Sequence, residues 1–316
     1  MKALIPPIPV EVLLKELTME RFLRKTNKGN NEIYVFSDQD SPNLMLEIGR
    51  LRELTFRHSG GGTGKELDID KYDLGENSFK QLIVWNPENN DIVGGYRFID
   101  CKNLEIDDNG QVQTPTAKLF NYSQKFIKEY LPFTIELGRS FVQPAYQPTS
   151  NLRKGMYSLD NLWDGLGALI VTYTQSRYFF GKVTMYGHFD VYARDLILSF
   201  MHKYFPDNER LVYPHNPLPI TTPKEKIDSV FIGSNYQEDY KNLNREVRLR
   251  NENIPPLVDA YMNLTSTMKT FGTALNASFG QVEETGIIVT MADIYPIKSD
   301  RHIKTFVPHQ IPNHHL

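Results

Sequence analysis

The spacing of hydrophobic and polar residues changes along the chain between the helical and the strand period. Apolar residues recur at near-helical spacing over residues 10–26 and 43–56, which predicts an amphipathic helix in each segment. Residues 81–85 and 92–99 are apolar runs typical of strands. The turn-forming residues 86–91 lie between them, so the pattern predicts a hairpin.

The rest of the chain mixes further helices and strands. Strands are expected at 32–36, 133–142, 179–186 and 286–294, and helices at 121–130, 161–178, 190–204 and 256–268. Asn121 or Ser123 is expected to cap one helix and Asp190 another. The segments 59–75, 144–159 and 205–228 are expected to be loops. This order favours an α/β or α+β sandwich around one sheet.

Composition excludes several classes of protein. The chain has 316 residues, enough for one large domain or two small ones. Its 35 basic and 38 acidic residues give a net charge of −3, which argues against a basic nucleic-acid-binding domain. A single cysteine, Cys101, excludes an internal disulfide and is expected to be a buried thiol.

The hydropathy of the chain predicts a cytoplasmic protein. Three prolines interrupt the apolar residues 1–9, so no signal peptide is expected. The longest weakly polar run, 165–174, is far shorter than the roughly 20 residues that span a bilayer. Peripheral contact with a membrane stays open, because an amphipathic surface needs no long apolar run.

Two neighbouring segments carry possible binding chemistry. Residues 59–66 are rich in glycine like a phosphate-binding loop, but Ser59 begins the segment and Glu66 replaces the magnesium-binding Ser or Thr. We therefore expect an ordinary loop there. Residues 66–73 contain four carboxylates. They form either a solvated acidic loop or a site for the amine of a small cationic substrate.

Glu136 and Arg139 lie in the apolar strand segment 133–142. A buried charge is costly unless it is paired. Their odd spacing places them on opposite faces of a regular strand, unless a bulge intervenes at Gly138. Two interpretations stay open: a structural ion pair, for example with Arg97, or a catalytic or substrate-orienting role.

The sequence has no recognisable nucleophile or metal motif. A Gly-x-Ser-x-Gly elbow and a His-Glu-x-x-His motif are both missing. No metal site is therefore expected.

The order of several segments resembles GNAT-type N-acyltransferases of aminolipid synthesis. These "hemolysin-like" enzymes include lyso-ornithine-lipid and glycine-lipid synthases, and acyl-homoserine-lactone synthases are more distantly similar. The resemblance rests on these positions: Arg50 or Arg52 with Phe56, then 70–73, 81–84, 93–98, 136–146, 162–166, 178–181 and 254–257. Each segment is weak evidence alone, but their shared order is specific.

The resemblance implies a GNAT-like fold, a mixed and splayed β-sheet flanked by helices. It places the acyltransferase domain at residues 41–300. Residues 1–40 are then an N-terminal helix and strand that pack on the core, and 301–316 are a C-terminal tail.

The resemblance also implies direct transfer of a fatty acyl group, expected to be 3-hydroxyacyl, from a thioester to a primary amine. The donor is expected to be acyl carrier protein (ACP), or else acyl-CoA, with no tightly bound cofactor. Glycine and ornithine are the expected acceptors. As alternatives, the chain is a signal-molecule synthase that uses S-adenosylmethionine, or a non-catalytic hemolysin-like membrane-binding protein.

The resemblance suggests roles for the charged residues. Asp70 and Asp73, together with Ser140, are expected to bind the substrate amine. Glu136 is expected to take the proton of the amine. Arg97 and Arg139 hold an acceptor carboxylate or fix the position of Glu136.

One segment departs from the usual GNAT pattern. Val142 and Tyr146 begin the donor-binding motif, but a longer loop with Arg153, Lys154 and Gly155 replaces the short glycine-rich loop that holds coenzyme A. We expect these residues to contact the phosphopantetheine phosphate or an acidic carrier protein. The alternative is that Arg153 and Lys154 are a solvated basic pair.

Overall fold

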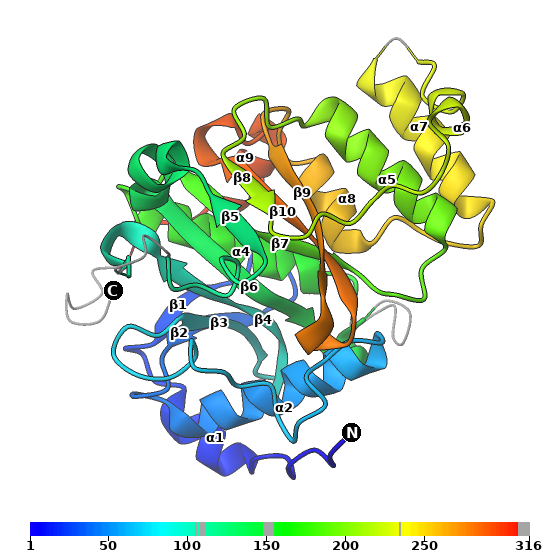
Figure 1. Ribbon diagram of the computed structural model, residues 1–316. Coiled ribbons are helices and arrows are strands. Elements are labelled where there is room, and N and C mark those ends of the chain that lie inside the picture. Colours follow the sequence, from blue (N-terminus) through cyan, green and yellow to red (C-terminus); the bar gives the residue numbers. More distant parts are fainter. Residues whose placement is uncertain (105, 108–111, 148–154, 234, 309–316) are drawn as a thin grey trace. The chain divides into compact units, whose positions relative to one another are not determined.

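Five antiparallel strands form the centre of the first of two units into which the chain divides. The computed structural model describes residues 1–104, 106–107, 112–147, 155–233 and 235–308 (Figure 1). Unit 1 comprises Met1–Asn103, Phe133–Arg177 and Tyr295–Leu316, and unit 2 comprises Leu104–Pro132 and Tyr178–Ile294.

The strands of unit 1 lie in the order β1-β2-β3-β4-β6. Their bounds are Phe22–Lys25 (β1), Glu32–Phe36 (β2), Lys80–Asn86 (β3), Asp91–Asp100 (β4) and Thr134–Val142 (β6). The helices of unit 1 are α1 (Val10–Glu16), α2 (Pro42–His58), α4 (Ser158–Thr172) and α9 (Pro296–His302). Short 3-10 turns follow β4 at Cys101–Asn103 and β6 at Pro144–Tyr146.

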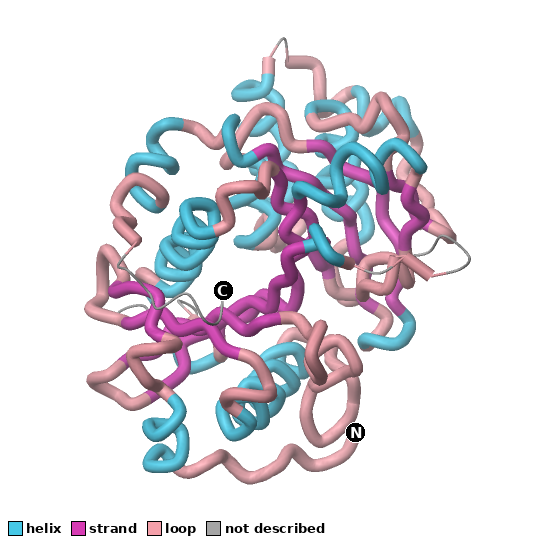
Figure 2. Tube along the Cα trace, turned by 90° about the vertical axis from the view of Figure 1, so that its left-hand side faces the viewer, coloured by secondary structure: helices cyan, strands magenta, loops and turns pink. Residues whose placement is uncertain are grey.

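Helices α2 and α4 cover opposite faces of these strands, as Figures 1 and 2 show. Successive side chains of a strand point to opposite faces. On β3, Gln81 contacts Arg52 of α2, whereas a Cβ on Gly165 of α4 would meet the neighbouring Leu82. The face toward α2 carries polar partners, and the face toward α4 is apolar.

Unit 2 is built around a second antiparallel group of strands, in the order β7-β10-β9. Their bounds are Tyr178–Met185 (β7), Lys269–Asn276 (β9) and Val282–Thr290 (β10), and β5 (Phe120–Tyr122) pairs separately with β8 (Val212–Pro214). The helices are α5 (Val191–Tyr204), α6 (Lys224–Asp228), α7 (Tyr236–Arg248) and α8 (Pro256–Met262), with a π-helical turn at Phe126–Tyr130 and 3-10 turns at Leu131–Phe133, Ala277–Phe279 and Met291–Asp293.

Most of the predicted elements are confirmed. The hairpin is β3 and β4, the strand at 133–142 is β6, and the helix at 43–56 is α2. The predicted cap Asp190 accepts a hydrogen bond from the Ala193 amide at the start of α5. The fold is a sheet flanked by helices, as the GNAT resemblance predicted.

Other predicted elements are wrong in extent. The helix at 10–26 ends at Glu16, because residues 22–25 instead pair with β2 as strand β1. Asn121 belongs to β5, so the helix expected from there begins after Ser123, whose hydroxyl accepts from the Phe126 amide at 3.1 Å. The expected helix at 161–178 ends at Thr172, and β7 begins at Tyr178.

Two elements of unit 2 were not predicted. Helix α7 buries Leu243 and Val247 but is otherwise rich in polar residues, so few apolar positions mark it in the sequence. Strand β9 contains Gly272 at φ +85°, which breaks its alternation. Part of the long loop expected at 205–228 forms β8 and α6.

No helix among the described residues has both the length and the apolar character needed to cross a bilayer.

Gly94 allows the close approach of β4 and β6. A Cβ at this position would lie 2.3 Å from the carbonyl oxygen of Phe141, which is backbone and cannot turn away. We predict that Gly94→Ala lowers the free energy of unfolding by about 1–3 kcal/mol or more, the cost of overpacking. Gly187→Ala is the matched control, since its nearest atom would be 3.6 Å away. Equal stability of the two variants in urea unfolding would contradict this packing.

Candidate active site

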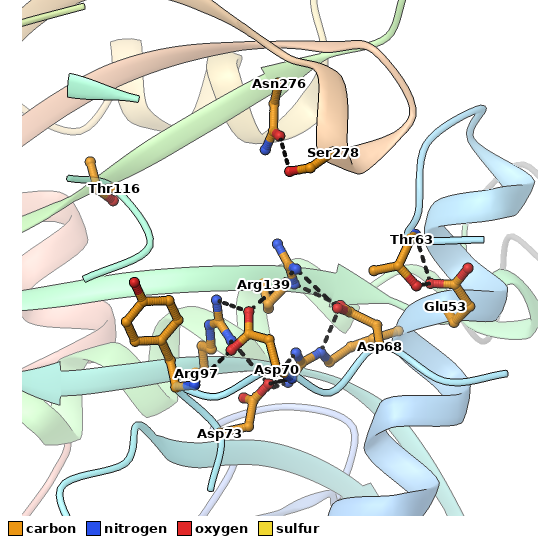
Figure 3. A network of polar contacts seen from close by, with 12 residues as sticks. Glu53, Thr63, Asp68, Asp70, Asp73, Arg97, Thr116, Arg139, Asn276 and Ser278 are labelled. Carbon is orange, nitrogen blue, oxygen red and sulfur yellow. Dashed lines mark hydrogen bonds and ion pairs between the residues drawn. The ribbon is translucent and has the colours of Figure 1, made fainter. Parts of the chain in front are cut away.

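Three arginines and three aspartates form one network in unit 1 (Figure 3). Arg52 comes from α2, Arg97 from β4 and Arg139 from β6. The aspartates Asp68, Asp70 and Asp73 come from the segment between α2 and β3. The network therefore ties an irregular segment to one helix and two strands.

Asp73 lies at the buried centre of the network, with no exposed surface. Both its oxygens accept from Arg52, at 3.1 and 3.0 Å, and Oδ2 also accepts from Arg97 at 3.0 Å. Gln81 donates to Oδ1 at 3.1 Å, and the backbone amide of Asp70 donates to Oδ2 at 3.0 Å. These bonds fix the turn at residues 70–73.

Asp68 joins Arg52 to Arg139. It is also fully buried, and its Oδ2 accepts from Arg52 Nε at 3.1 Å. Arg139 contacts it at two points, which form a fork: Nη2 donates to Oδ1 at 2.9 Å, and Nε forms an ion pair with Oδ2 at 2.6 Å. Such a bidentate contact fixes the orientation of the guanidinium as well as its position.

Asp70 is the aspartate of the network that solvent reaches. Its side chain is 27% exposed, whereas those of Asp68 and Asp73 are not exposed. Arg97 donates to its two oxygens at 3.0 and 3.2 Å. Arg139 lies 3.8 Å from it and is 15% exposed. Asp70 and Arg139 thus form the accessible edge of the network.

The electrostatics of the network depend on mutual neutralisation. Burial by itself raises the pKa of Asp73, but Arg52 and Arg97 outweigh it and hold that pKa well below its ordinary value. Burial also opposes ionisation of Asp68, yet Arg139 and Arg52 lower the pKa of its carboxyl. Three guanidinium groups face three carboxylates, so the six residues are neutral as a group and stay ionised when buried.

A bulge in β6 brings Arg139 into the network. The pairing with β4 shifts between Arg97, which faces Gly138, and Gly95, which faces Phe141. Between these two pairs β6 advances by three residues while β4 advances by two, so β6 has one extra residue. Arg139, in this part of β6, takes a left-handed φ of +50°. A non-glycine residue there costs about 1–3 kcal/mol, which the fork to Asp68 offsets. The bulge expected at Gly138 is thus found one residue later.

Glu136 lies on the same strand face as Gly138, and it is 1% exposed. Its neighbours include Tyr72, whose pKa is raised by burial, by Asp70 and by Glu136. Burial and Glu136 also raise the pKa of the Cys101 thiol, which is buried as expected. Ser140 is half-buried within the bulge. Glu136 and Arg139 were expected on opposite faces of the strand, and Arg97 is distant in sequence. The three residues nevertheless share one side of the strands.

Comparisons with known proteins place the chain in a family. The Acetyltransferase (GNAT) domain family matches residues 51–154, and all six residues of the network lie within this range. A "Glycine N(alpha)-acyltransferase" of Phocaeicola vulgatus is 53% identical over 97% of this chain and 94% of its own length. A protein of the same name from Bacteroides thetaiotaomicron is 52% identical over 97% of this chain and 91% of its own. The chain belongs to this family of GNAT-type N-acyltransferases.

A solved structure, that of the AHL synthase LasI, is also similar to part of this N-acyltransferase. The likeness has a TM-score of 0.32 at 11% identity, and it covers 50% of this chain and 74% of that one.

The residues expected on the donor side of the N-acyltransferase are placed in part. Val142 ends β6, and its carbonyl accepts from the Gln147 side chain at 2.8 Å. Tyr146 is buried, and its hydroxyl donates to Asp91 at 3.2 Å. Gly155 is buried just before α4. Arg153 and Lys154 lie outside the described residues.

The glycine-rich segment 59–66 is held by the carboxylate of Glu53. The Glu53 carboxylate is fully buried and accepts from the Thr63 amide at 2.9 Å, the Thr63 hydroxyl at 2.8 Å and the Gly64 amide at 2.7 Å. Arg57 pairs with the same carboxylate at 2.7 Å. The segment is an ordinary loop, as its departures from a phosphate-binding motif predicted.

Sequence reasoning assigned no role to Arg52, Asp68 or Gln81. The signal for Arg52 was a charge on the buried face of α2, where Ile48 and Phe56 are its helical neighbours. Asp68 was counted only as part of an acidic string, and Gln81 only as part of a strand. Among the residues that the structure describes, no group of His, Cys, Asp or Glu side chains is arranged to hold a metal ion.

We predict that Asp73→Asn destabilises the protein strongly at neutral pH. Removing one partner of a buried ion pair costs about 3–5 kcal/mol, because Arg52 and Arg97 stay buried with less compensation. Urea unfolding measures the change. Asp228→Asn removes an exposed pair with Lys224 and is the matched control, with little loss of stability expected.

The same variant tests the pH dependence of stability. The folded-state pKa of Asp73 is depressed, so its contribution is present above the ordinary carboxyl pKa of about 4 and is lost as the pH falls below it. Wild type should therefore lose more stability than Asp73→Asn between pH 7 and pH 3. Parallel curves for the two proteins would show that Asp73 is not held in this way.

Proposed function

We propose that this N-acyltransferase moves a fatty acyl group, of the 3-hydroxyacyl class, from acyl carrier protein to the amine of glycine. The observation that carries the proposal is the 53% identity to a glycine N(alpha)-acyltransferase over 97% of the chain. The likeness spans nearly the full length of both proteins. The product is an N-acyl amino acid, a precursor of an aminolipid.

The charge network favours glycine over ornithine as the acceptor. Ornithine carries a second amine, which needs a carboxylate of its own in the pocket. Asp68 and Asp73 are fully buried and already bound by arginines, which leaves Asp70 as the accessible carboxylate of the network. Glycine brings only one amine and one carboxylate and needs no further acidic group.

The accessible edge of the network gives each side chain a role. Arg139 holds the acceptor carboxylate at the edge, since its fork to Asp68 fixes the guanidinium plane. Asp70 attracts the ammonium group. Asp73, which is buried, acts indirectly by holding the turn that carries Asp70. Glu136 accepts the proton that the ammonium must lose before it becomes a nucleophile.

The reaction needs only the two substrates. The freed amine nitrogen attacks the thioester carbonyl carbon, so a C–N bond forms and the C–S bond breaks. One ammonium proton goes to Glu136 before attack, and a second passes to the departing thiolate. The protein contributes positioning and charge, which hold the two reactants in line.

Carrier protein is the proposed donor because the coenzyme A motif is altered. A longer segment follows Val142–Tyr146 in place of the short loop whose amides hold a pyrophosphate. A phosphopantetheine arm on a protein carries one phosphate diester and no nucleotide, so it needs no pyrophosphate loop.

The test incubates the purified protein with a 3-hydroxyacyl carrier protein and a panel of amino acids, with products identified by mass spectrometry. We expect N-(3-hydroxyacyl)glycine as the main product. A main product from ornithine would overturn the acceptor assignment, and equal rates with the same acyl group on coenzyme A would overturn the donor assignment. Transfer to S-adenosylmethionine in place of amino acids would identify a signal-molecule synthase.

Glu136→Gln should lower kcat by about 10²–10⁴-fold, the usual contribution of a general base. The amide keeps the size of the side chain but cannot accept a proton from the ammonium group. Steady-state kinetics with glycine and far-UV circular dichroism check activity and fold together. Glu11→Gln on the exposed side of α1 is the control. Wild-type turnover in Glu136→Gln would exclude Glu136 as the base.

A further inference from the structure

A groove of about 850 Å³ lies along helix α7 in unit 2. Its lining includes three basic residues of α7, Lys241, Arg245 and Arg248. Leu249, which follows the helix, and the single acidic residue Asp259 also line it. It is separate from the residues of the charge network, which all belong to unit 1. Neither the sequence motifs nor the proposed reaction assign it a role.

Helix α7 presents its basic residues outward and buries its apolar ones. Lys241, Arg245 and Arg248 are spaced four and three residues apart, so they lie along one face, and all three are exposed. Leu243 and Val247 lie on another face and have no exposed surface, because α7 packs against α5. The outward face of α7 is therefore cationic.

The positive charge of the groove is only partly neutralised by the residues that the structure describes. Asp259 is bound by the Tyr240 hydroxyl and by the Asn263 amide, at 3.2 Å for the latter. Arg245 pairs with Glu246 at 3.2 Å. Within the part of the chain that the structure describes, Lys241 and Arg248 have no carboxylate partner. Two full charges are thus available to an anionic ligand.

We propose that this α7 groove docks an acidic carrier protein that delivers the acyl thioester. The proposal rests on the proposed function and names the surface for its donor. A hollow lined by unpaired cations matches a convex surface of acidic side chains. A membrane fits less well, since a helix that inserts into lipid must expose an apolar face and α7 buries its own.

The exposed charges of the groove mainly raise the rate at which the carrier protein associates. Exposed charges steer a partner of opposite sign and raise its association rate, and salt weakens the effect. The Debye length falls from about 10 Å at 0.1 M salt to about 3 Å at 1 M. Binding through the α7 groove is therefore expected to weaken as salt is added.

The test compares Lys241→Glu/Arg248→Glu with the matched control Lys15→Glu/Lys128→Glu. Both pairs reverse two exposed basic residues, so they change the net charge equally. Binding of fluorescently labelled holo carrier protein is measured by anisotropy, and kcat and KM are measured with 3-hydroxyacyl carrier protein and with the same acyl group on N-acetylcysteamine.

We expect the α7 variant to bind carrier protein about tenfold more weakly, and to show a matching rise in KM for the carrier-bound donor, because repulsion replaces attraction. Its kinetics with the small thioester should equal those of wild type, and the control should behave as wild type throughout.

Unchanged carrier binding in the α7 variant would overturn the proposal, whether or not wild type transfers the acyl group. Loss of binding to phosphatidylglycerol vesicles with carrier binding intact would overturn it in favour of a membrane surface. Wild type that binds carrier protein through α7 but transfers no acyl group would support the docking surface and overturn the proposed function.

Discussion

The site of this N-acyltransferase depends on the pairing of buried guanidinium groups with buried carboxylates. Arg52 and Arg97 meet at Asp73, and Arg52 and Arg139 meet at Asp68. None of these aspartates could stay ionised in the interior alone, and no arginine could be buried without them. The arrangement is therefore stable only as a whole, which explains why one helix, two strands and an irregular segment are fixed together.

The pairing also places two charged groups at the edge of the buried region. Residues 68–73 before β3 form neither helix nor strand, and the Asp73 carboxylate helps to hold their turn by accepting from the Asp70 amide. Arg139 occupies a strained bulge, which the fork to Asp68 stabilises. Asp70 and Arg139 keep partial contact with solvent, so a small zwitterion can meet both charges. In the proposed function, stability and substrate binding thus use the same residues.

Periodicity alone predicted the elements whose apolar pattern is strong, such as α2, β3, β4 and β6. It failed where tertiary contacts decide, as at β1, where pairing with β2 ends a helical pattern. The charge pattern singled out Glu136, Arg139 with Arg97, and the acidic segment, and the family resemblance suggested their roles. Their meeting could not be predicted, because the bulge that turns Arg139 toward Asp68 depends on the register between β4 and β6. Arg52 was missed because its partners lie 16 and 21 residues away in an irregular segment.

The most direct test of this account is the coupling between Asp68 and Arg139 in catalysis. The value of kcat/KM for glycine is measured for Asp68→Asn, Arg139→Gln and the double variant. If the fork to Asp68 is what positions Arg139, each single variant loses the same function, and the double variant should be little worse than Arg139→Gln alone. Losses that simply multiply in the double variant would show that the two residues act independently, and they would contradict the network as the basis of the site.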